Sequence, residues 1–260
     1  MSATGTIRPP VAAPFGWREE GEVVWLEVAL GVATGAFSTR LGGGSEGAFR
    51  SLNLGVLTDD DRDRVLENRR TLAGALGRDA GSLVLGRQVH GTAVEIRESA
   101  PEPGAPLREA DAQITATCKL TPLVLVADCV PLLLGTADAV AAVHCGWRGV
   151  AGGIVEKALA AVRERARGDV FAALGPGIGA CCYEVGPEVL AAFEARGHEQ
   201  RPGRRLDLPG AVRHELERFA VPAERIHACG LCTSCNPQLF FSHRRDGGQT
   251  GRQAGLAWLD

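Results

Sequence analysis

The sequence predicts a mixed α+β protein in which β-sheets pack between layers of helices. Short apolar runs rich in β-branched residues recur along the chain, and segments with helical periodicity lie between them. This interleaving favours an α/β or α+β sandwich over an all-helical or all-β protein. The 260 residues show no fixed repeat and no obvious interdomain linker, so we expect one domain over residues 1–260, with residues 1–20 as a flexible N-terminal extension.

The predicted elements follow these patterns in chain order. Strands are expected at residues 22–30, 82–84, 92–96, 123–126, 131–134, 139–144, 170–174 and 226–228. Helices are expected at residues 62–76, 150–167, 187–196 and 209–219. Residues 98–108 contain three prolines and are predicted to form a loop.

Charge and cysteine content limit the classes of function. A formal net charge of -3 and the lack of a long Lys/Arg run argue against nucleic acid as the main partner. No apolar run approaches the roughly 20 residues that span a bilayer, and residues 1–14 lack the pattern of a secretory signal. We therefore expect a cytoplasmic protein with no membrane partner. Eight cysteines would be tolerable there as reduced thiols.

Three separated motifs each place a soft metal ligand at a chain turn. His90 lies in Gln88-Val89-His90-Gly91, Cys129 follows Asp128, and His144 ends a predicted strand. Two imidazoles and one thiolate suit Zn²⁺, and three protein ligands leave a coordination position open for water or substrate. We therefore predict a catalytic metal triad of His90, Cys129 and His144.

Each of these residues also has a structural interpretation. A lone cysteine or histidine is often a core residue, and the intervals between the three match no short zinc signature. Asp128 is a candidate base or a carboxylate that orients a histidine. It fits a turn residue at a strand end equally well, because aspartate there hydrogen-bonds its own backbone.

A second cysteine-rich segment contains Cys229, Cys232 and Cys235 in a C-x₂-C-x₂-C run. The run is similar to an iron–sulfur ligand set, but Leu239 stands where the fourth cysteine would be. Cys181 or Cys182 could complete a four-cysteine site for zinc or a cluster. The alternative is a mixture of structural and incidental thiols.

Glycine and arginine mark three loops. The glycine-rich segments at residues 42–47 and 175–179 lack the fingerprint of a nucleotide-binding loop and are predicted to be turns. The loop at residues 242–252 carries three arginines among Ser, Thr and Gly. It either holds an anion such as phosphate or is a solvated basic loop.

The chain resembles the YfiH family, also called the laccase-domain or polyphenol oxidoreductase family and, in bacteria, the peptidoglycan editing factor family. Many motifs carry this resemblance, in family order from about residue 35 to the C-terminus. They include Phe37-Ser38-Thr39-Arg40, Ser51-Leu52-Asn53-Leu54-Gly55, Asn68-Arg69, Gln88-Val89-His90-Gly91, Ala110-Asp111-Ala112, Ala127-Asp128-Cys129-Val130-Pro131, His144-Cys145-Gly146-Trp147-Arg148-Gly149, Cys182-Tyr183-Glu184-Val185-Gly186 and Phe241-Ser242-His243-Arg244-Arg245-Asp246.

The resemblance implies a four-layer α/β/β/α sandwich with mixed β-sheets, similar to the catalytic domain of cytotoxic necrotizing factor. It implies zinc, with copper as the alternative, at His90, Cys129 and His144. The implied activity is phosphorolysis of adenosine, inosine and methylthioadenosine by a monomer, together with deamination of adenosine. The family's other names leave two alternatives open, a copper-dependent polyphenol oxidoreductase and a hydrolase that edits peptidoglycan precursors.

Within that activity, we expect Asp128 to move a proton during deamination, in which zinc lowers the pKa of water from 15.7 to roughly 7. Phosphate is assigned to Arg40, Arg148 and the Arg244-Arg245 pair, because a guanidinium matches the anion in a bidentate manner. Asn53 and Gln88 are expected to contribute to the same substrate site.

Two positions depart from the family pattern. Cys145 replaces the usual Ala, and His243 replaces the usual Tyr. A thiol beside the metal could change the metal preference, and His243 could add a titrating donor near a bound anion.

Overall fold

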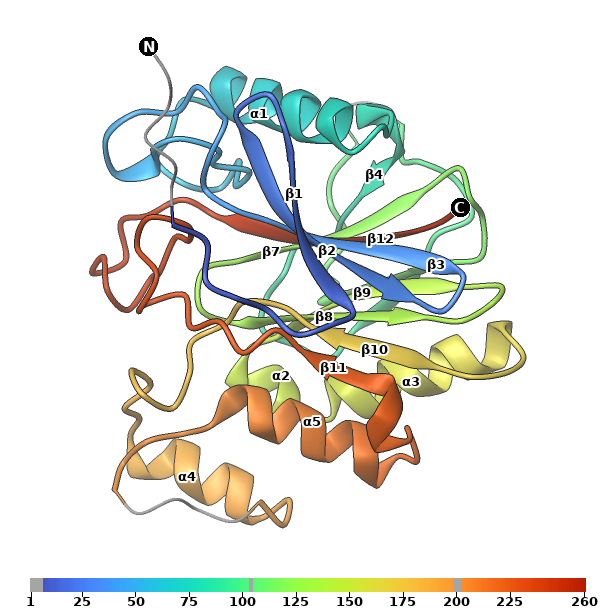
Figure 1. The fold of residues 1–260 in the computed structure, drawn as a ribbon. Coiled ribbons are helices and arrows are strands. Elements are labelled where there is room, and N and C mark those ends of the chain that lie inside the picture. Colours follow the sequence, from blue (N-terminus) through green and yellow to red (C-terminus); the bar gives the residue numbers. More distant parts are fainter. Residues whose placement is uncertain (1–6, 103–104, 199–202) are drawn as a thin grey trace.

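Two six-stranded sheets lie face to face in the computed structural model, which describes residues 7–102, 105–198 and 203–260 (Figure 1). The strands are β1 (Phe15–Glu20), β2 (Val23–Leu30), β3 (Ala33–Ser38), β4 (Leu83–Val84), β5 (Val94–Ile96), β6 (Ala112–Thr115), β7 (Thr121–Val126), β8 (Val130–Gly135), β9 (Val140–Cys145), β10 (Phe171–Leu174), β11 (Ile226–Ala228) and β12 (Gln253–Leu259). The first sheet has the order β1-β2-β3-β12-β7-β4, and the second has the order β11-β10-β8-β9-β6-β5.

Both sheets are mixed. In the first sheet β4 runs parallel to β7, and the other neighbours pair antiparallel. In the second sheet β5 and β6 are parallel, as are β10 and β11, while the remaining pairs are antiparallel. The pairing therefore confirms mixed sheets.

Helices cover the outer face of each sheet. They are α1 (Arg62–Ala75), α2 (Trp147–Ala151), α3 (Ile154–Arg165), α4 (Pro187–Glu194) and α5 (Leu208–Arg218), with short 3₁₀ turns η1 (Gly47–Phe49), η2 (Ala80–Ser82) and η3 (Ala223–Arg225). Leu72 of α1 packs in one apolar cluster with Trp25 and Leu256 of the first sheet. Leu159 of α3 and Leu216 of α5 pack on the second sheet. The predicted four-layer α/β/β/α sandwich is confirmed.

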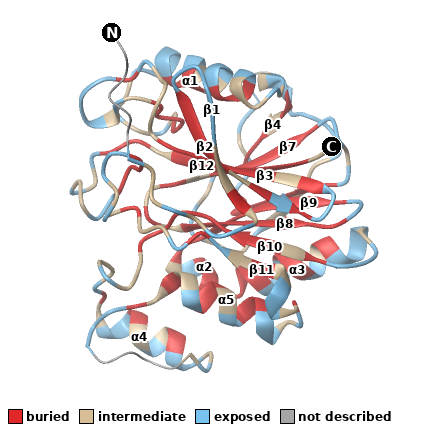
Figure 2. Ribbon diagram, in the orientation of Figure 1, coloured by how far each residue is buried: buried red, intermediate tan, exposed pale blue. Residues whose placement is uncertain are grey.

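The strands in the middle of the sandwich are largely buried (Figure 2), and the contact between the two sheets is apolar. Leu26, Val28 and Phe37 of the first sheet form a buried cluster with Leu133 and Ala142 of the second. Strands β8 and β9 are buried along their whole length, because one face meets the first sheet and the other meets the helices. None of the described helices is long and apolar enough to cross a membrane.

The predicted helix at residues 150–167 is instead two helices. Helix α2 already begins at Trp147. The helical conformation is then interrupted at Gly152 and Gly153 before α3 begins. Gly153 has a φ of 91°, in the left-handed region that ends a run of right-handed helix. The break places α2 as a separate short helix directly after His144.

The prediction of a flexible extension at residues 1–20 is wrong for residues 15–20, which form β1. Phe15 is buried, and the indole Nε1 of Trp17 donates a hydrogen bond to the Pro9 carbonyl at 2.8 Å. These aromatic contacts and the antiparallel pairing with β2 fix the segment. Residues 1–6 lie outside the described part of the chain. In the predicted loop at residues 98–108, positions 103 and 104 also lie outside it, and the remainder contains no helix or strand.

Two connections carry the chain from the first sheet to the second. Residues 127–129 join β7 of the first sheet to β8 of the second, and residues 85–93 join β4 of the first sheet to β5 of the second. Cys129 lies on the first connection and His90 on the second. These two connections therefore bring Cys129 and His90, which are far apart in sequence, to the same edge of the sandwich.

Candidate active site

His90, Cys129 and His144 meet at this edge. One ligand atom from each side chain lies within 4.8 Å of the other two, and the Cys129 Sγ is 3.7 Å from the His90 Nε2. Gly146 packs against them: a Cβ at this position would lie 2.6 Å from the His90 ring and 3.2 Å from the Cys129 sulfur. The structure thus brings the predicted triad together, and only glycine fits beside it.

Both turns that carry the ligands contain a non-glycine residue in the left-handed region, His90 with a φ of 59° and Asp128 with a φ of 94°. Such a conformation costs on the order of 1–3 kcal/mol and persists where other contacts hold it. Around His90, those contacts are three backbone N–H groups that donate to the Asp111 carboxylate: Val89 at 3.1 Å, His90 at 3.0 Å and Gly91 at 2.9 Å.

Asp111 also orients His144. The fully buried carboxylate accepts a hydrogen bond from the His144 Nδ1 at 2.7 Å, and the Asp111 carbonyl accepts one from the His144 backbone N–H at 2.7 Å. A carboxylate that binds one ring nitrogen fixes the tautomer and leaves Nε2 for a metal ion. The sequence analysis did not assign a role to Asp111. An aspartate next to a buried apolar strand such as β6 needs hydrogen-bond partners, and this need is the signal that could have identified it.

The charges of the triad are coupled. Burial opposes ionisation of Cys129, but the charge of His144 and hydrogen bonds from both histidines lower the pKa of the thiol to about 6. Burial likewise opposes protonation of His144, yet Cys129 and Asp111 raise its pKa to about 9. The metal-free site therefore holds a thiolate beside an imidazolium at neutral pH, and the thiolate is the form that binds metal.

The Asp128 side chain binds two loops through hydrogen bonds. Its Oδ1 accepts a hydrogen bond from the Thr233 hydroxyl at 2.6 Å, and its Oδ2 accepts one from the Arg244 backbone N–H at 2.7 Å. The Asp128 carbonyl also accepts from Ile178 N–H at 2.7 Å. These bonds occupy both carboxylate oxygens, which favours a positioning role over the predicted role as a proton shuttle.

A cavity of about 470 Å³ opens beside the triad. Its described lining includes His90, Cys129 and His144, together with apolar side chains of Leu85, Leu107, Leu125, Trp147 and Ile178 and the phenol of Tyr183. This volume lies within the range of small-ligand pockets, which are roughly 300–1,000 Å³. The triad therefore faces a space that a small organic substrate can enter.

Five arginines bring positive charge to the cavity wall: Arg69, Arg87, Arg148, Arg244 and Arg252. Sequence reasoning assigned phosphate to Arg148 and Arg244 but gave no such role to Arg69. The Nε of Arg69 donates to the Leu54 carbonyl at 2.9 Å, while its buried Nη2 has no hydrogen-bond partner among the described residues. Burial lowers the pKa of Arg69 to about 10, so the group stays charged at neutral pH.

Three predicted substrate residues, Arg40, Asn53 and Arg245, are not among the described residues that line the cavity. Arg40 donates to the Arg50 and Pro237 carbonyls, and its guanidinium stacks on Phe241. Arg245 is bound by the Asp246 carboxylate and by the carbonyls of Thr233 and Phe240. Backbone and carboxylate partners in the fold bind both guanidinium groups, and their assignment to phosphate stays a prediction.

The two predicted amide residues also support loops. Asn53 is fully buried, donates to Thr58 and Asp60, and accepts from the Gly55 and Arg252 backbone N–H groups. Gln88 lines the cavity, but its amide forms a two-way hydrogen bond with the backbone of Leu125 at 2.7 and 2.8 Å. Both hold cavity walls in place through the backbone.

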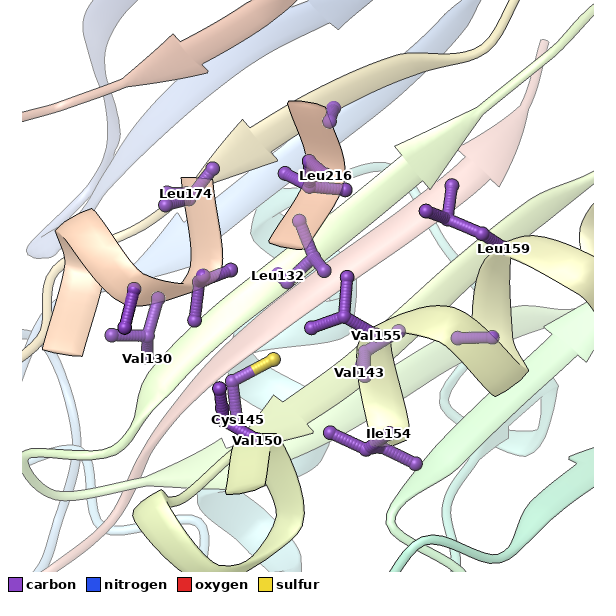
Figure 3. Packing of buried hydrophobic residues seen from close by; sticks show 14 of the residues in the cluster. Val130, Leu132, Val143, Cys145, Val150, Ile154, Val155, Leu159, Leu174 and Leu216 are labelled. Atoms are coloured by element: carbon purple, nitrogen blue, oxygen red, sulfur yellow. The ribbon is translucent and has the colours of Figure 1, made fainter. Parts of the chain in front are cut away.

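The two departures from the family pattern differ in position. Cys145 alternates with His144 along β9, so its side chain points to the helices and packs beside Leu132, Val143 and Val150 (Figure 3). The expectation that this thiol changes the metal site is therefore not supported, because Cys145 is buried in the opposite direction. His243 lies on the cavity wall and is exposed.

The four-layer sandwich and the family match of the chain together place it in the laccase-domain class of proteins. The chain belongs to the YfiH family within it: residues 34–260 match the family described as "Multi-copper polyphenol oxidoreductase laccase".

Several named relatives support this assignment. The chain is 38% identical over 251 residues to "Purine nucleoside phosphorylase YlmD" of Geobacillus stearothermophilus, an alignment that covers 88% of this chain and 92% of the relative. It is 42% identical over 230 residues to a purine nucleoside phosphorylase of Deinococcus radiodurans, covering 84% and 85%. The crystal structure of Geobacillus YlmD superposes with a TM-score of 0.85 at 34% identity and covers 95% of this chain and 99% of that one.

Proposed function

We propose that this chain is a zinc-dependent phosphorylase of purine nucleosides. The observation that carries the proposal is the joint placement of a two-histidine, one-cysteine ligand set and the unpartnered Arg69 Nη2 on one small cavity. The names of the relatives, purine nucleoside phosphorylases, support the same reaction class.

The donor set fits zinc. One thiolate and two imidazoles are borderline-soft donors, and three protein ligands suit a catalytic ion with an open position. Asp111 supplies the outer hydrogen bond that metal-binding histidines generally have. When bound by His90, Cys129 and His144, zinc would supply a Lewis acid at the cavity wall.

Phosphorolysis breaks the bond between C1′ of the ribose and N9 of the purine, and a phosphate oxygen forms the new bond to C1′. The site must therefore hold an anion next to the sugar. Arg69 offers a buried N–H group with no partner in the fold, and an anion would satisfy it. Arg148, Arg244 and Arg252 add positive charge around the same space.

The apolar wall fits the base. Leu85, Leu125 and Ile178 line the cavity together with Trp147, and such surfaces accept a flat aromatic ring. Burial raises the pKa of Tyr183 to about 12, so its hydroxyl keeps the proton at neutral pH and can donate a hydrogen bond to a polar edge of the substrate.

Product analysis distinguishes the activities expected from the family. Purified protein of known zinc content is incubated with adenosine, inosine or methylthioadenosine, with and without phosphate, and the products are separated by chromatography. Adenine that forms only with phosphate, in equal amount to ribose 1-phosphate, supports phosphorolysis. Inosine from adenosine without phosphate would add deamination at the same site.

The family description favours one competing function, copper-dependent oxidation of phenols. Among the described residues, the candidate metal sites are one histidine-containing triad and one group of four cysteines, whereas a multicopper oxidase needs several copper centres rich in histidine. Oxygen uptake with a phenol and stoichiometric copper, without turnover of any nucleoside, would replace the phosphorylase proposal.

A further inference from the structure

Four cysteines outside the triad lie together at a second position. The sulfur atoms of Cys181, Cys182, Cys232 and Cys235 are all within 4.8 Å of one another. We propose that this four-cysteine cluster binds a structural zinc ion. The site is separate from the triad and does not depend on the proposed nucleoside activity.

The spacing fits a single ion. A tetrahedral zinc with Zn–S bonds of about 2.3 Å separates its sulfur ligands by about 3.8 Å. The shortest contacts in the cluster are 3.4 Å between Cys182 and Cys235 and 3.5 Å between Cys181 and Cys235. An iron–sulfur cluster would place several iron and sulfide atoms between the thiolates, and four sulfurs this close leave too little room for them.

A disulfide explains the arrangement less well. Cys235 lies almost equally far from Cys181 and Cys182, so no single partner is selected. Closing either bond would leave the other two thiols beside it without a role. A tetrahedral ion uses all four sulfurs at once.

The surrounding backbone supports a thiolate site. The Gly179 N–H donates to the Cys232 Sγ at 3.3 Å, a contact that stabilises negative charge on sulfur. Gly179 also gives the cluster space, because a Cβ there would lie 3.3 Å from the Cys181 sulfur. Cys232 and Cys235 have the C-x₂-C spacing of structural zinc sites.

Cys229, the first cysteine of the predicted C-x₂-C-x₂-C run, is excluded from the site. It is buried in the apolar cluster between the two sheets. The other two ligands come instead from the loop after β10, which carries Cys181 and Cys182. The chain therefore contributes two pairs of ligands from two loops.

The ion would join two walls of the active-site cavity. The loop after β10 carries Tyr183, which lines the cavity. The loop after β11 carries Thr233, whose hydroxyl binds Asp128 next to Cys129. Gly177 already pairs with the second loop through hydrogen bonds to Leu231 and Thr233 of 3.3 and 3.0 Å. Zinc bound by cysteines of both loops would hold the two loops together next to these hydrogen bonds.

Metal analysis of the reduced, zinc-loaded protein and its variants tests the site. We expect about two zinc ions per chain in the parent protein, about one in Cys235→Ser, and about one in Cys129→Ala, which lacks the triad thiolate. Cys118→Ser replaces an exposed cysteine outside both sites and is the matched control. It should keep the zinc content of the parent.

Cobalt substitution in Cys129→Ala gives a readout that does not require Cys235→Ser to fold. A four-thiolate cobalt site produces intense thiolate-to-metal charge-transfer bands, and these should appear in Cys129→Ala, which keeps all four cysteines of the cluster. The proposal is overturned if Cys129→Ala binds neither zinc nor cobalt, if it binds iron with a cluster chromophore, or if mass spectrometry finds a disulfide in the freshly purified parent.

Discussion

His144 and Asp111 are joined by a buried 2.7 Å hydrogen bond, and the same carboxylate accepts three backbone N–H groups of the His90 turn. One side chain thus positions two of the three candidate metal ligands. Because Asp111 directly precedes β6, which pairs with β9, the sheet itself sets the distance between the carboxylate and His144. The geometry of the candidate active site therefore follows from strand pairing.

Replacing Asp111 with Asn should weaken metal binding by roughly 10–100-fold, the usual effect of removing an outer partner of a metal-binding histidine. Competition with a coloured chelator measures the affinity, and circular dichroism checks the fold. Asp138→Asn is the control, since Asp138 is exposed in the turn between β8 and β9. Equal zinc affinity of Asp111→Asn and the parent protein would contradict the positioning role.

Arg69→Gln should raise the KM for phosphate by roughly tenfold or more, because a charge-assisted hydrogen bond to the anion is lost. The KM for the nucleoside should change much less. Arg70→Gln provides the matched control, since Arg70 follows Arg69 on α1, is exposed and pairs with Glu67. If both variants keep the phosphate KM of the parent protein, Arg69 does not bind the anion.

In metal-free protein, alkylation of Cys129 by iodoacetamide should be half-maximal near pH 6, because the pKa of this thiol is lowered to about 6. The rate rises with pH as the thiolate forms and should be suppressed by zinc. Peptide mass spectrometry follows each cysteine. Cys145 should stay unmodified, since it is buried and its pKa is raised. A midpoint near pH 9 for Cys129 would oppose the thiolate assignment.

Asp128→Asn should lower the free energy of unfolding by about 1–3 kcal/mol. The two carboxylate oxygens accept hydrogen bonds from Thr233 and Arg244, and the –NH₂ group of asparagine cannot accept one of them. We expect the pH dependence of kcat to keep its shape. Loss of one limb of the pH profile, with stability unchanged, would restore Asp128 as a proton shuttle.

Glu215 on α5 should make stability depend on pH. Burial opposes its charge, but the ion pair with Arg196 and the nearby His198 and Arg218 lower its pKa below the ordinary value of 4.5. The stabilisation is thus complete above about pH 4.5 and is lost as pH falls through the lower folded pKa. Glu215→Gln should cost about 3 kcal/mol at pH 7 and progressively less in acid.

The exposed Glu217→Gln on the same helix is its control and should change stability by about 0.5 kcal/mol or less, since Glu217 forms an exposed pair with Arg213. Denaturant unfolding across pH measures both variants. A Glu215→Gln penalty that grows as the pH falls would contradict the assigned charge.

The local pattern predicted eight of the strands in the described residues but missed β1, β3, β6 and β12. Of these missed strands, β3 and β12 contain central glycines, which are typical strand breakers. In the fold, a Cβ on Gly35 would lie 2.9 Å from Leu133, and one on Gly255 would lie 2.8 Å from Pro131. The glycines allow the two sheets to approach closely, a tertiary reason that no local window contains.

The residues of the candidate site were likewise only partly predictable from local sequence. His90, Cys129 and His144 were predictable because soft ligands at strand ends are uncommon and the family motifs mark them. Asp111 and Arg69 also lie in family motifs, but their roles could not be predicted, since these depend on partners distant in sequence: His144 is 33 residues from Asp111. Among many arginines, only the fold distinguishes Arg69, which faces the cavity, from Arg245, which holds Asp246.

The most direct test of the central claim is to incubate the zinc-loaded parent protein and Cys129→Ala, side by side, with adenosine and phosphate, and to follow adenine over time. We predict adenine from the parent and none above background from Cys129→Ala at equal folded protein. Full turnover by Cys129→Ala, or no product from the parent protein with zinc bound at the triad, would contradict the assignment of nucleoside phosphorolysis to this site.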